Sequence, residues 1–232
     1  MSVDTPMVRL AGVSKRFTKG KETISIFDHL DLTIPRGDFV AVMGPSGSGK
    51  TTLLNLLGGI DHVDQGEITI ADQRIDGMSE AALARFRAAN VGFIFQFYNL
   101  MPMLTAAQNV ELPLLLTNLR GKDRATRVNT ALSVVNLADR VKHRPREMSG
   151  GQQQRVAIAR AIVSDPNLLL CDEPTGDLDR SSADEILGIL QLLNNDLGKT
   201  IVMVTHDPAA ARYAKRTLHL DKGRFIEREL AA

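Results

Sequence analysis

The stretch that decides the fold of this chain is Asp38-Phe39-Val40-Ala41-Val42-Met43-Gly44-Pro45-Ser46-Gly47-Ser48-Gly49-Lys50-Thr51-Thr52. Its first six residues form a short apolar run, which is typical of a buried strand. From Lys50 onward the apolar residues recur with helical spacing, and Gly58-Gly59 ends that pattern. A glycine-rich loop that follows a strand and opens a helix is the arrangement of a phosphate-binding loop. Its glycines let backbone N–H groups converge on phosphates, and the helix N-terminus adds partial positive charge.

Within this loop, we expect Lys50 to reach the β- and γ-phosphates of a nucleotide and the Thr51 hydroxyl to ligate Mg²⁺. The alternative is a glycine-rich turn with an incidental Lys-Thr pair, which the complete pattern between strand and helix disfavours. The loop alone does not separate kinases, GTPases, helicases and transporters.

The composition sets broad limits on the class of protein. At 232 residues, with 44% hydrophobic and 24% charged residues, the chain resembles an ordinary globular protein with a substantial core. It carries 28 basic and 27 acidic residues, so the formal net charge is +1. Nucleic-acid binding usually requires a basic excess or stripe, and we therefore expect no nucleic-acid partner.

Three further features concern compartment and membrane. Cys171 is the only cysteine, so no intrachain disulfide is expected, and its place after Leu168-Leu169-Leu170 predicts buried filler in a reducing compartment. No run of about 18 apolar residues exists, so no membrane span is expected. Residues 1–6 lack a basic start and an apolar core, so no secretory signal is expected either. A role at a membrane would therefore require docking onto another protein.

The order of predicted elements indicates an α/β fold. Strand patterns lie on both sides of a middle segment, about 99–163, that contains helices and almost no strand signal. Such an order predicts a mostly parallel core sheet, about 1–96 and 164–232, with a helical subdomain, about 97–163, in one structural domain over 1–232. The strands are expected at 8–13, 24–34, 91–95, 167–171 and 200–205, with hairpins at 66–75 and around 221–223. The helices are expected at 79–89, 105–116, 122–135, 152–163 and 181–197.

Polar residues stand at the ends of three predicted strands. Asp172 would hold Mg²⁺, usually through water, and Glu173 would polarise the attacking water as general base. Gln96 and His206 would project toward the same crevice and touch the γ-phosphate, its metal or the attacking water. Alone, Gln96 and His206 are each more often structural polar residues, and acidic residues at strand ends are common. The functional interpretation of all four residues therefore depends on their occurrence together with the loop at 44–52.

The segment Ser149-Gly150-Gly151-Gln152 predicts a second anion-favouring helix end, with Ser149 as N-cap. Ser149 follows Lys50 by 99 residues, most of them in the helical segment. One nucleotide does not need two helix ends on its γ-phosphate, so this end more naturally faces another protomer. A well-capped structural helix remains the alternative.

Taken in this order, the motifs resemble the ATPase subunit of ABC transporters over nearly the whole chain. The resemblance implies a P-loop NTPase fold with a RecA-like, mostly parallel core sheet, an antiparallel β subdomain and a helical subdomain. It implies ATP hydrolysis with Mg²⁺, and a dimer in which the signature, Met148 to Gln152, completes the nucleotide site of the opposite protomer. Met148 departs from the usual leucine, and Phe17 stands where most members stack a tyrosine on adenine.

The resemblance also implies a role for each site residue. Glu173, His206 and Gln96 would act in catalysis, and Thr51, Gln96 and Asp172 would bind the metal. ATP would be bound by Phe17, Gly44, Pro45, Ser46, Gly47, Ser48, Gly49, Lys50, Thr51 and Thr52, and in trans by Ser149, Gly150, Gly151, Gln152 and Asp179.

Finer similarity is to the lipoprotein-release and macrolide-export subgroup, although Asp177 stands where that subgroup often has asparagine. The implied partners are a second copy of the chain and integral-membrane permease subunits, at the cytoplasmic face of the inner (plasma) membrane. Chromosome-maintenance relatives place hundreds of coiled-coil residues between the phosphate loop and the signature, whereas here Ser149 follows Lys50 by 99 residues. Translation-type relatives join two ATPase units in one chain, and this chain has one. Both classes are therefore disfavoured. An ATPase whose permease regulates a cell-wall hydrolase or senses peptides remains the alternative function.

One apolar cluster is left with two interpretations. It follows Gln96 at the place where the family receives the permease's coupling helix, and a docking surface and buried core are equally compatible with it. Its members are Phe97, Tyr98, Leu100, Met101, Met103 and Leu104.

Overall fold

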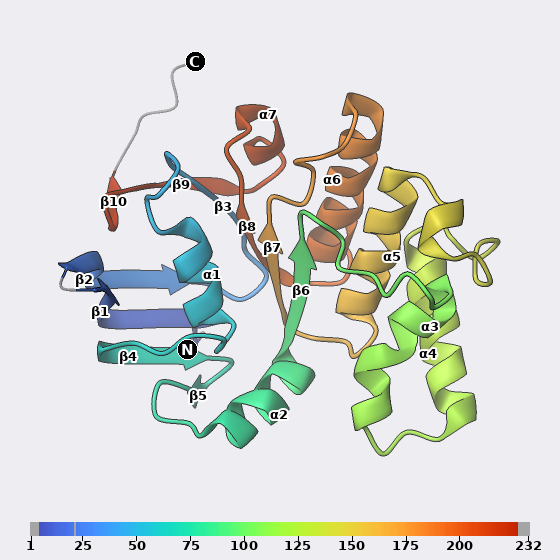
Figure 1. The fold of residues 1–232 in the computed structure, drawn as a ribbon, viewed down its shortest axis with the longest axis horizontal. Helices are drawn as coiled ribbons and strands as arrows, with labels where there is room; N and C mark the ends of the chain where they lie inside the picture. Colours follow the sequence, from blue (N-terminus) through green and yellow to red (C-terminus); the bar gives the residue numbers. More distant parts are fainter. Residues whose placement is uncertain (1–4, 21, 227–232) are drawn as a thin grey trace.

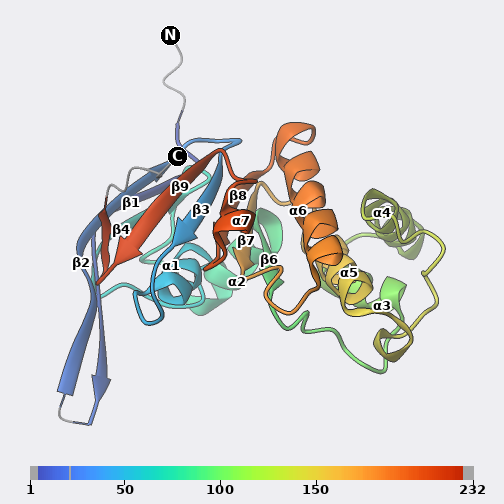
Figure 2. The ribbon, with the colours of Figure 1, turned by 90° about the horizontal axis from the view of Figure 1, so that it is seen from above.

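The computed structural model describes residues 5–20 and 22–226, which form layers stacked from an antiparallel sheet to an outer group of helices (Figure 1). The predicted boundaries at residues 1 and 232 lie outside the described residues. Seen from above, the layers run from β1, β2 and β4 through the central sheet to α6, α5 and finally α3 and α4 (Figure 2).

The antiparallel sheet has the strand order β2-β1-β4-β5. Its strands are β1 (Val8–Lys19), β2 (Glu22–Ile34), β4 (Gln65–Ile70) and β5 (Gln73–Arg74). β1 is longer than the predicted 8–13, because after Val13 it continues to pair with β2 as far as Lys19 and Glu22. The outer part of this pair projects from the body of the protein as an arm (Figure 2).

The central sheet has the order β10-β9-β3-β8-β7-β6, and all its neighbouring pairs are parallel except β9 with β10. The predicted mostly parallel core is confirmed. One row of the pairing register runs from Val42 through Val204 and Asp172 to Phe95. The residues that follow this row therefore leave four strands at the same edge. The strands are β3 (Phe39–Met43), β6 (Val91–Phe95), β7 (Leu168–Asp172), β8 (Thr200–Val204), β9 (Arg216–Asp221) and β10 (Arg224–Ile226).

Helices cover both faces of this sheet. Successive residues of β3 point to opposite faces, so Phe39 and Ala41 belong to one buried cluster and Val40 and Val42 to the other. The first cluster joins the sheet to α3–α6, and the second joins it to α1, α2 and the antiparallel sheet. The helices are α1 (Lys50–Leu57), α2 (Glu80–Asn90), α3 (Ala106–Glu111), η1 (Leu112–Leu116), α4 (Gly121–Val134), η2 (Pro145–Glu147), α5 (Gly150–Ile162), α6 (Arg180–Asn195) and α7 (Pro208–Ala211).

Three predicted N-caps are confirmed, whereas the helices expected from 122, 152 and 181 begin one or two residues earlier. Ser79, Thr105 and Ser149 are N-caps whose side chains accept a hydrogen bond from the backbone three residues on. The helix expected over 105–116 differs, because α3 ends at Glu111 and a tighter 3₁₀ turn follows. Pro113 explains this change, since it has no N–H to donate to the preceding turn.

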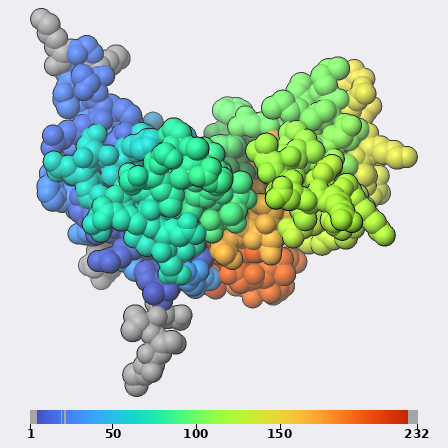
Figure 3. All heavy atoms as spheres, turned by 90° about the horizontal axis from the view of Figure 1, so that it is seen from below, coloured from blue at the N-terminus to red at the C-terminus, as the bar shows by residue number. Residues whose placement is uncertain are grey.

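From below, the part of the molecule that contains α2 and the helical lobe bulge on either side of an indentation (Figure 3). A cavity of about 300 Å³ in this region is lined by Ala88 of α2, Phe93 and Phe95 of β6, and Arg160 of α5. None of the helices within the described residues is both long enough and apolar enough to cross a bilayer.

The close approach of α5 to the sheet rests on Gly92. A Cβ at this position of β6 would lie 2.4 Å from the carbonyl oxygen of Ala161. We expect Gly92→Ala to lower the free energy of unfolding by about 1–3 kcal/mol, because backbone must move to admit the methyl group. Gly188→Ala is the matched control, since Gly188 lies exposed in α6 with no atom within 4 Å of its added Cβ. That variant should gain about 0.5–1 kcal/mol. Urea unfolding of both variants checks the pair, and equal effects would contradict this account of the α5 contact.

Candidate functional site

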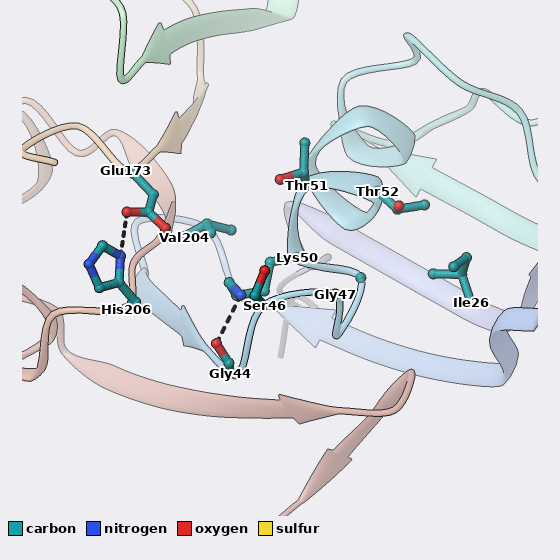
Figure 4. Close-up of a pocket in the computed structure, with 11 residues that line it drawn as sticks. Ile26, Gly44, Ser46, Gly47, Lys50, Thr51, Thr52, Glu173, Val204 and His206 are labelled. Atoms are coloured by element: carbon teal, nitrogen blue, oxygen red, sulfur yellow. Dashed lines mark hydrogen bonds and ion pairs between the residues drawn. The ribbon is translucent and has the colours of Figure 1, made fainter.

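The glycine-rich loop lies between β3 and α1, as its sequence predicts, and forms one wall of a cavity of about 480 Å³ (Figure 4). Gly49 caps α1 with φ 103°, a backbone conformation that L side chains rarely adopt. Its missing Cβ also leaves room for Phe27, whose ring carbon would otherwise lie at 3.0 Å. The cavity is lined by Ile26, Gly44, Ser46, Gly47, Gly49, Lys50, Thr51, Thr52, Glu173, Val204 and His206.

The loop presents cationic and N–H groups to this cavity. The Lys50 ammonium donates to the carbonyl oxygens of Gly44 at 2.8 Å and of Pro45 at 2.9 Å, which holds the cation over its own loop. The first turn of α1 contains no acidic residue, so the partial positive charge of the helix N-terminus is not neutralised there. This wall is therefore suited to an anion.

Hydroxyl groups complete the loop. Thr51 is exposed and Thr52 half-buried at the cavity wall. Ser48 is buried, and its Oγ has no hydrogen-bond partner among the described residues. A buried polar group without a partner is costly, so this oxygen is available to a ligand that enters the loop.

Two carboxylates leave the central sheet beside the loop. Asp172 ends β7, and its pKa is raised by burial and by the neighbouring Glu173, while Lys50 opposes the shift. Glu173 has φ 47°, and its backbone N–H donates to the Val204 carbonyl oxygen. A non-glycine residue rarely adopts this conformation, and in it the Glu173 side chain lines the cavity.

His206 leaves β8 and meets Glu173 directly. Its Nδ1 lies 2.5 Å from Glu173 Oε2, and both side chains line the cavity (Figure 4). The imidazole remains 70% exposed, whereas the carboxylate is 21% exposed. The ring can therefore reach a ligand in the cavity without losing its place beside Glu173.

Gln96 lies apart from this group. It leaves β6 at the same sheet edge but does not line the cavity. A Cβ on Gly176 would lie 2.9 Å from Gln96 Nε2, so the amide packs against the loop that continues to Asp179. The structure thus brings His206 to the cavity and leaves Gln96 beside the neighbouring loop.

Four other residues predicted for this half of the site also lie outside the cavity wall: Phe17, Asp172, and Pro45 and Ser48 of the loop itself. Phe17 is on the β1–β2 arm, 43% exposed, and Asp172 is the half-buried last residue of β7. Ile26 of β2 lines the cavity, and sequence reasoning missed it. Its side chain lies against the glycine loop, since a Cβ on Gly49 would lie 2.9 Å from Ile26 Cγ2, and no sequence motif marks this contact.

The Ser149 segment forms the N-terminus of α5 in the helical lobe, away from the cavity wall. Ser149 Oγ accepts from Gln152 N at 3.3 Å, and Gln152 Oε1 accepts from Ser149 N at 3.0 Å, which is a complete capping box. No acidic residue stands in the first turn, and Met148 is buried in the core as an apolar residue should be. This helix end is a second position suited to an anion.

Asp179 caps α6 next to this helix end. Its carboxylate accepts from Ser182 N at 3.0 Å and Ser182 Oγ at 2.7 Å, and these bonds lower its pKa. A Cβ on Gly151 would lie 2.9 Å from the same Ser182 Oγ. The Asp179 loop and the Ser149 segment therefore form one surface.

A buried amide joins α5 to the sheet edge. Gln154 is fully buried, and its Nε2 donates to the Pro174 carbonyl oxygen at 2.6 Å and to the Phe95 carbonyl oxygen at 3.2 Å. Phe95 precedes Gln96, and Pro174 follows Glu173. Gln154 thus fixes the signature helix to both strand ends.

The donor set fits a nucleoside triphosphate with Mg²⁺. Lys50 and the α1 N-terminus suit the phosphates, and the Thr51 hydroxyl and Asp172 are oxygen ligands of the kind Mg²⁺ takes. Among the described residues, no group of three or more His, Cys, Asp or Glu side chains is arranged to hold a metal ion. Mg²⁺ is commonly bound by one or two protein oxygen ligands together with the phosphates of a substrate.

Comparison with known proteins agrees with this geometry. Residues 27–176 match the family described as "ABC transporter". The lipoprotein-releasing system ATP-binding protein LolD of Chromohalobacter salexigens is 42% identical over 233 residues, covering 97% of this chain and 98% of that protein. The macrolide export ATP-binding/permease protein MacB 1/2 of Paracoccus denitrificans is 44% identical over 221 residues, covering 95% of this chain and 33% of that protein. A dimeric, post-hydrolysis structure of the ATP-binding cassette MJ0796 (Methanocaldococcus jannaschii) bound to ADP and Pi has a TM-score of 0.87 and 40% identity, covering 96% of this chain and 98% of that one.

The raised pKa of Asp172 leads to a stability prediction. Burial and Glu173 penalise the Asp172 carboxylate in the folded protein, so we expect Asp172→Asn to raise the free energy of unfolding of the nucleotide-free protein at pH 7. Because the folded-state pKa lies above the unfolded one, the penalty is fully present above the folded pKa and is lost as the pH falls toward the unfolded value. The gain from Asp172→Asn should therefore shrink as the pH is lowered from 7.

Urea unfolding at several pH values from 7 down to about 4, near the ordinary pKa of an aspartate, measures this difference. Asp139→Asn is the control, because Asp139 is an exposed carboxylate on the surface of the helical lobe and should show no such gain. A loss of stability on Asp172→Asn at pH 7 would contradict the assigned cause.

Proposed function

The chain belongs to the ABC transporter family, and from this premise we propose that its two anion-suited helix ends are the two halves of ATP sites shared between protomers. The chain is an ATP-binding subunit that hydrolyses ATP with Mg²⁺, and related cassettes form dimers. The observation that carries the proposal is the separation of Lys50 from Ser149: one lies in the cavity wall, and the other lies at the N-terminus of α5 in the helical lobe.

In the cis half of the site, the loop residues 44–52 bind the phosphates. Lys50 exchanges its bonds to the Gly44 and Pro45 carbonyl oxygens for bonds to the β- and γ-phosphates. Thr51, Asp172 and Gln96 would hold Mg²⁺, which would neutralise developing charge on the phosphate oxygens, and Gln96 would have to turn from Gly176 to do so. Phe17 stacks on the adenine from the arm, and Ile26 gives the cavity an apolar wall beside it.

Glu173 acts as the general base on the attacking water. Its carboxylate is held by the β7 strand end and by His206 at 2.5 Å, so its orientation is fixed before substrate binds. His206 keeps Glu173 in place and reaches the γ-phosphate with its exposed ring. This division of roles follows from their unequal exposure.

In the trans half, Ser149, Gly150, Gly151 and Gln152 receive the γ-phosphate of the partner's ATP, and Asp179 lies at the dimer interface. Support comes from the capped α5 N-terminus without acidic residues and from the contact between Gly151 and Ser182.

We further propose that residues 1–232 work as one ABC ATPase domain that docks on a permease at the cytoplasmic face of the plasma membrane. The apolar cluster after Gln96 supports this: Phe97 is 73% exposed, Met103 75% and Met101 53%, so three of its six members lie at the surface and none of the six is fully buried. The nearby cavity between α2 and α5 offers a recess for a permease segment. The relatives named for lipoprotein release and macrolide export favour this subgroup over a hydrolase-regulating or peptide-sensing complex.

Replacing Glu173 with Gln tests the base. The amide keeps the shape of the carboxylate but cannot take a proton, so the rate of ATP hydrolysis should fall by about 10²–10⁴-fold while ATP binding persists. The variant should accumulate as a closed dimer with ATP, as measured by size-exclusion chromatography. Glu67→Gln is the control: it neutralises an exposed carboxylate on β4 by the same substitution and should leave the rate of ATP hydrolysis unchanged. Full turnover by Glu173→Gln would remove Glu173 from the role of base.

Ser149→Arg tests the shared site. We expect ATP binding by the monomer to remain and hydrolysis to be lost, because the arginine side chain would occupy the position of the partner's γ-phosphate. Ser79→Arg is the matched control, since Ser79 caps α2 in the same way and each substitution costs about 1 kcal/mol of capping. Equal losses of activity in the two variants, or loss of monomer binding in Ser149→Arg, would count against the shared site.

A further inference from the structure

The arm that carries Phe17 is tied to the body of the protein by a buried lysine. Lys15 is 7% exposed, and its ammonium donates to Asp61 Oδ1 at 2.6 Å and to the His62 carbonyl oxygen at 2.7 Å. Asp61 and His62 follow α1, the helix that begins at Lys50. Lys15 thus connects the β1–β2 arm to the far end of the phosphate-loop helix.

The same ammonium lies over the face of Phe17, 4.8 Å from the centre of the ring. At this distance a cation is attracted to the ring face, and it prevents the ring from turning that face to another group. Phe17 is otherwise 43% exposed on a projecting pair of strands (Figure 2). The cation therefore orients an aromatic ring that would have rotational freedom.

Lys15 is one of several contacts that hold the arm to the body of the protein. Two other bonds already join these segments: Asp64 Oδ2 accepts from Arg16 N at 2.6 Å, and Ser14 O accepts from Asp64 N at 3.0 Å. A buried charge with its counterion contributes little to stability compared with an apolar side chain of similar volume. A cation at this position needs another explanation, and the orientation of the ring provides it.

We infer that Lys15, anchored by Asp61 and the His62 carbonyl, is a positioning residue for base recognition: it fixes Phe17 so that the uncovered ring face stacks on the adenine. The inference rests on the proposed role of Phe17. Because Asp61 and His62 lie just beyond the end of α1, their contact with Lys15 also fixes the position of the Phe17 ring relative to the phosphate loop at the start of α1. Lys15 thereby acts on the base and not on the phosphates.

Binding of two probes separates these effects. In the purified full chain without Mg²⁺, Lys15→Met should weaken ATP binding about three- to tenfold and leave the affinity for inorganic tripolyphosphate unchanged, as measured by calorimetry and competition. Lys15→Arg keeps a cation and should restore most of the ATP affinity. With Mg²⁺, the change in Lys15→Met should appear in KM for ATP rather than in kcat. Arg9→Met, an exposed cation removed from the same strand, is the control.

A double-mutant cycle then assigns the effect to the ring. In the Phe17→Ala background, Lys15→Met should cause no further loss of ATP affinity. The double variant Lys15→Met/Asp61→Asn leaves no unpaired carboxylate and should show the same selective loss, which keeps the test valid if Lys15→Met alone folds poorly. Thermal unfolding of each variant verifies the fold.

Each other outcome overturns the inference. Equal weakening of ATP and tripolyphosphate would mean that Lys15 supports the phosphate loop or the fold, and unchanged ATP affinity would remove its role altogether. In both cases, a loss of ATP affinity in Phe17→Ala would still support the proposed stacking of Phe17 on the adenine. If Phe17→Ala itself binds ATP normally, the proposed role of Phe17 fails and the inference falls with it.

Discussion

Four parallel strands are paired so that Val42, Val204, Asp172 and Phe95 lie in one row across the central sheet. Each strand ends at or near that row, and each is followed by a residue of the proposed site: the loop from Gly44, then His206, Glu173 and Gln96. A shift of one residue in any pairing would reverse the faces of that strand and move its terminal side chain away from the others. The sheet edge that carries these site residues therefore depends on backbone hydrogen bonds between apolar strands. These strands are buried on both faces by helices and by the antiparallel sheet.

Much of this arrangement was predictable because the signals are local. The run 38–52 contains strand, loop and helix in sequence, and the caps Ser79, Thr105 and Ser149 each determine where a helix begins from their own side chain. The parallel sheet followed from the alternation of strands and helices around a helical insert. Since these features depend on residues a few positions apart, a single sequence carries them.

The remaining features depend on contacts between distant residues. The extension of β1 to Lys19 needs its partner β2, and Ile26 reaches the cavity wall only because that pairing places it opposite the glycine loop. The positive φ of Glu173 is imposed by the Val204 carbonyl and the surrounding sheet, not by the residue type. Gln96 was expected in the same crevice as His206, yet it packs against Gly176, because the strand end fixes where the backbone leaves the sheet but not which way the side chain turns.

The amide of Gln154 has a mechanical consequence. Its two hydrogen bonds hold α5 to the ends of β6 and β7, so a rotation of the helical lobe that preserves them has its fulcrum at this point. Ser149 lies five residues before Gln154, an arm of about 7.5 Å along the helix. The outer helix α4 lies on the far side of the lobe (Figure 2). A rotation of the lobe about Gln154 would move α4 and the α5 N-terminus together, so it would couple the outer surface of the lobe to the helix end that we propose to receive the γ-phosphate.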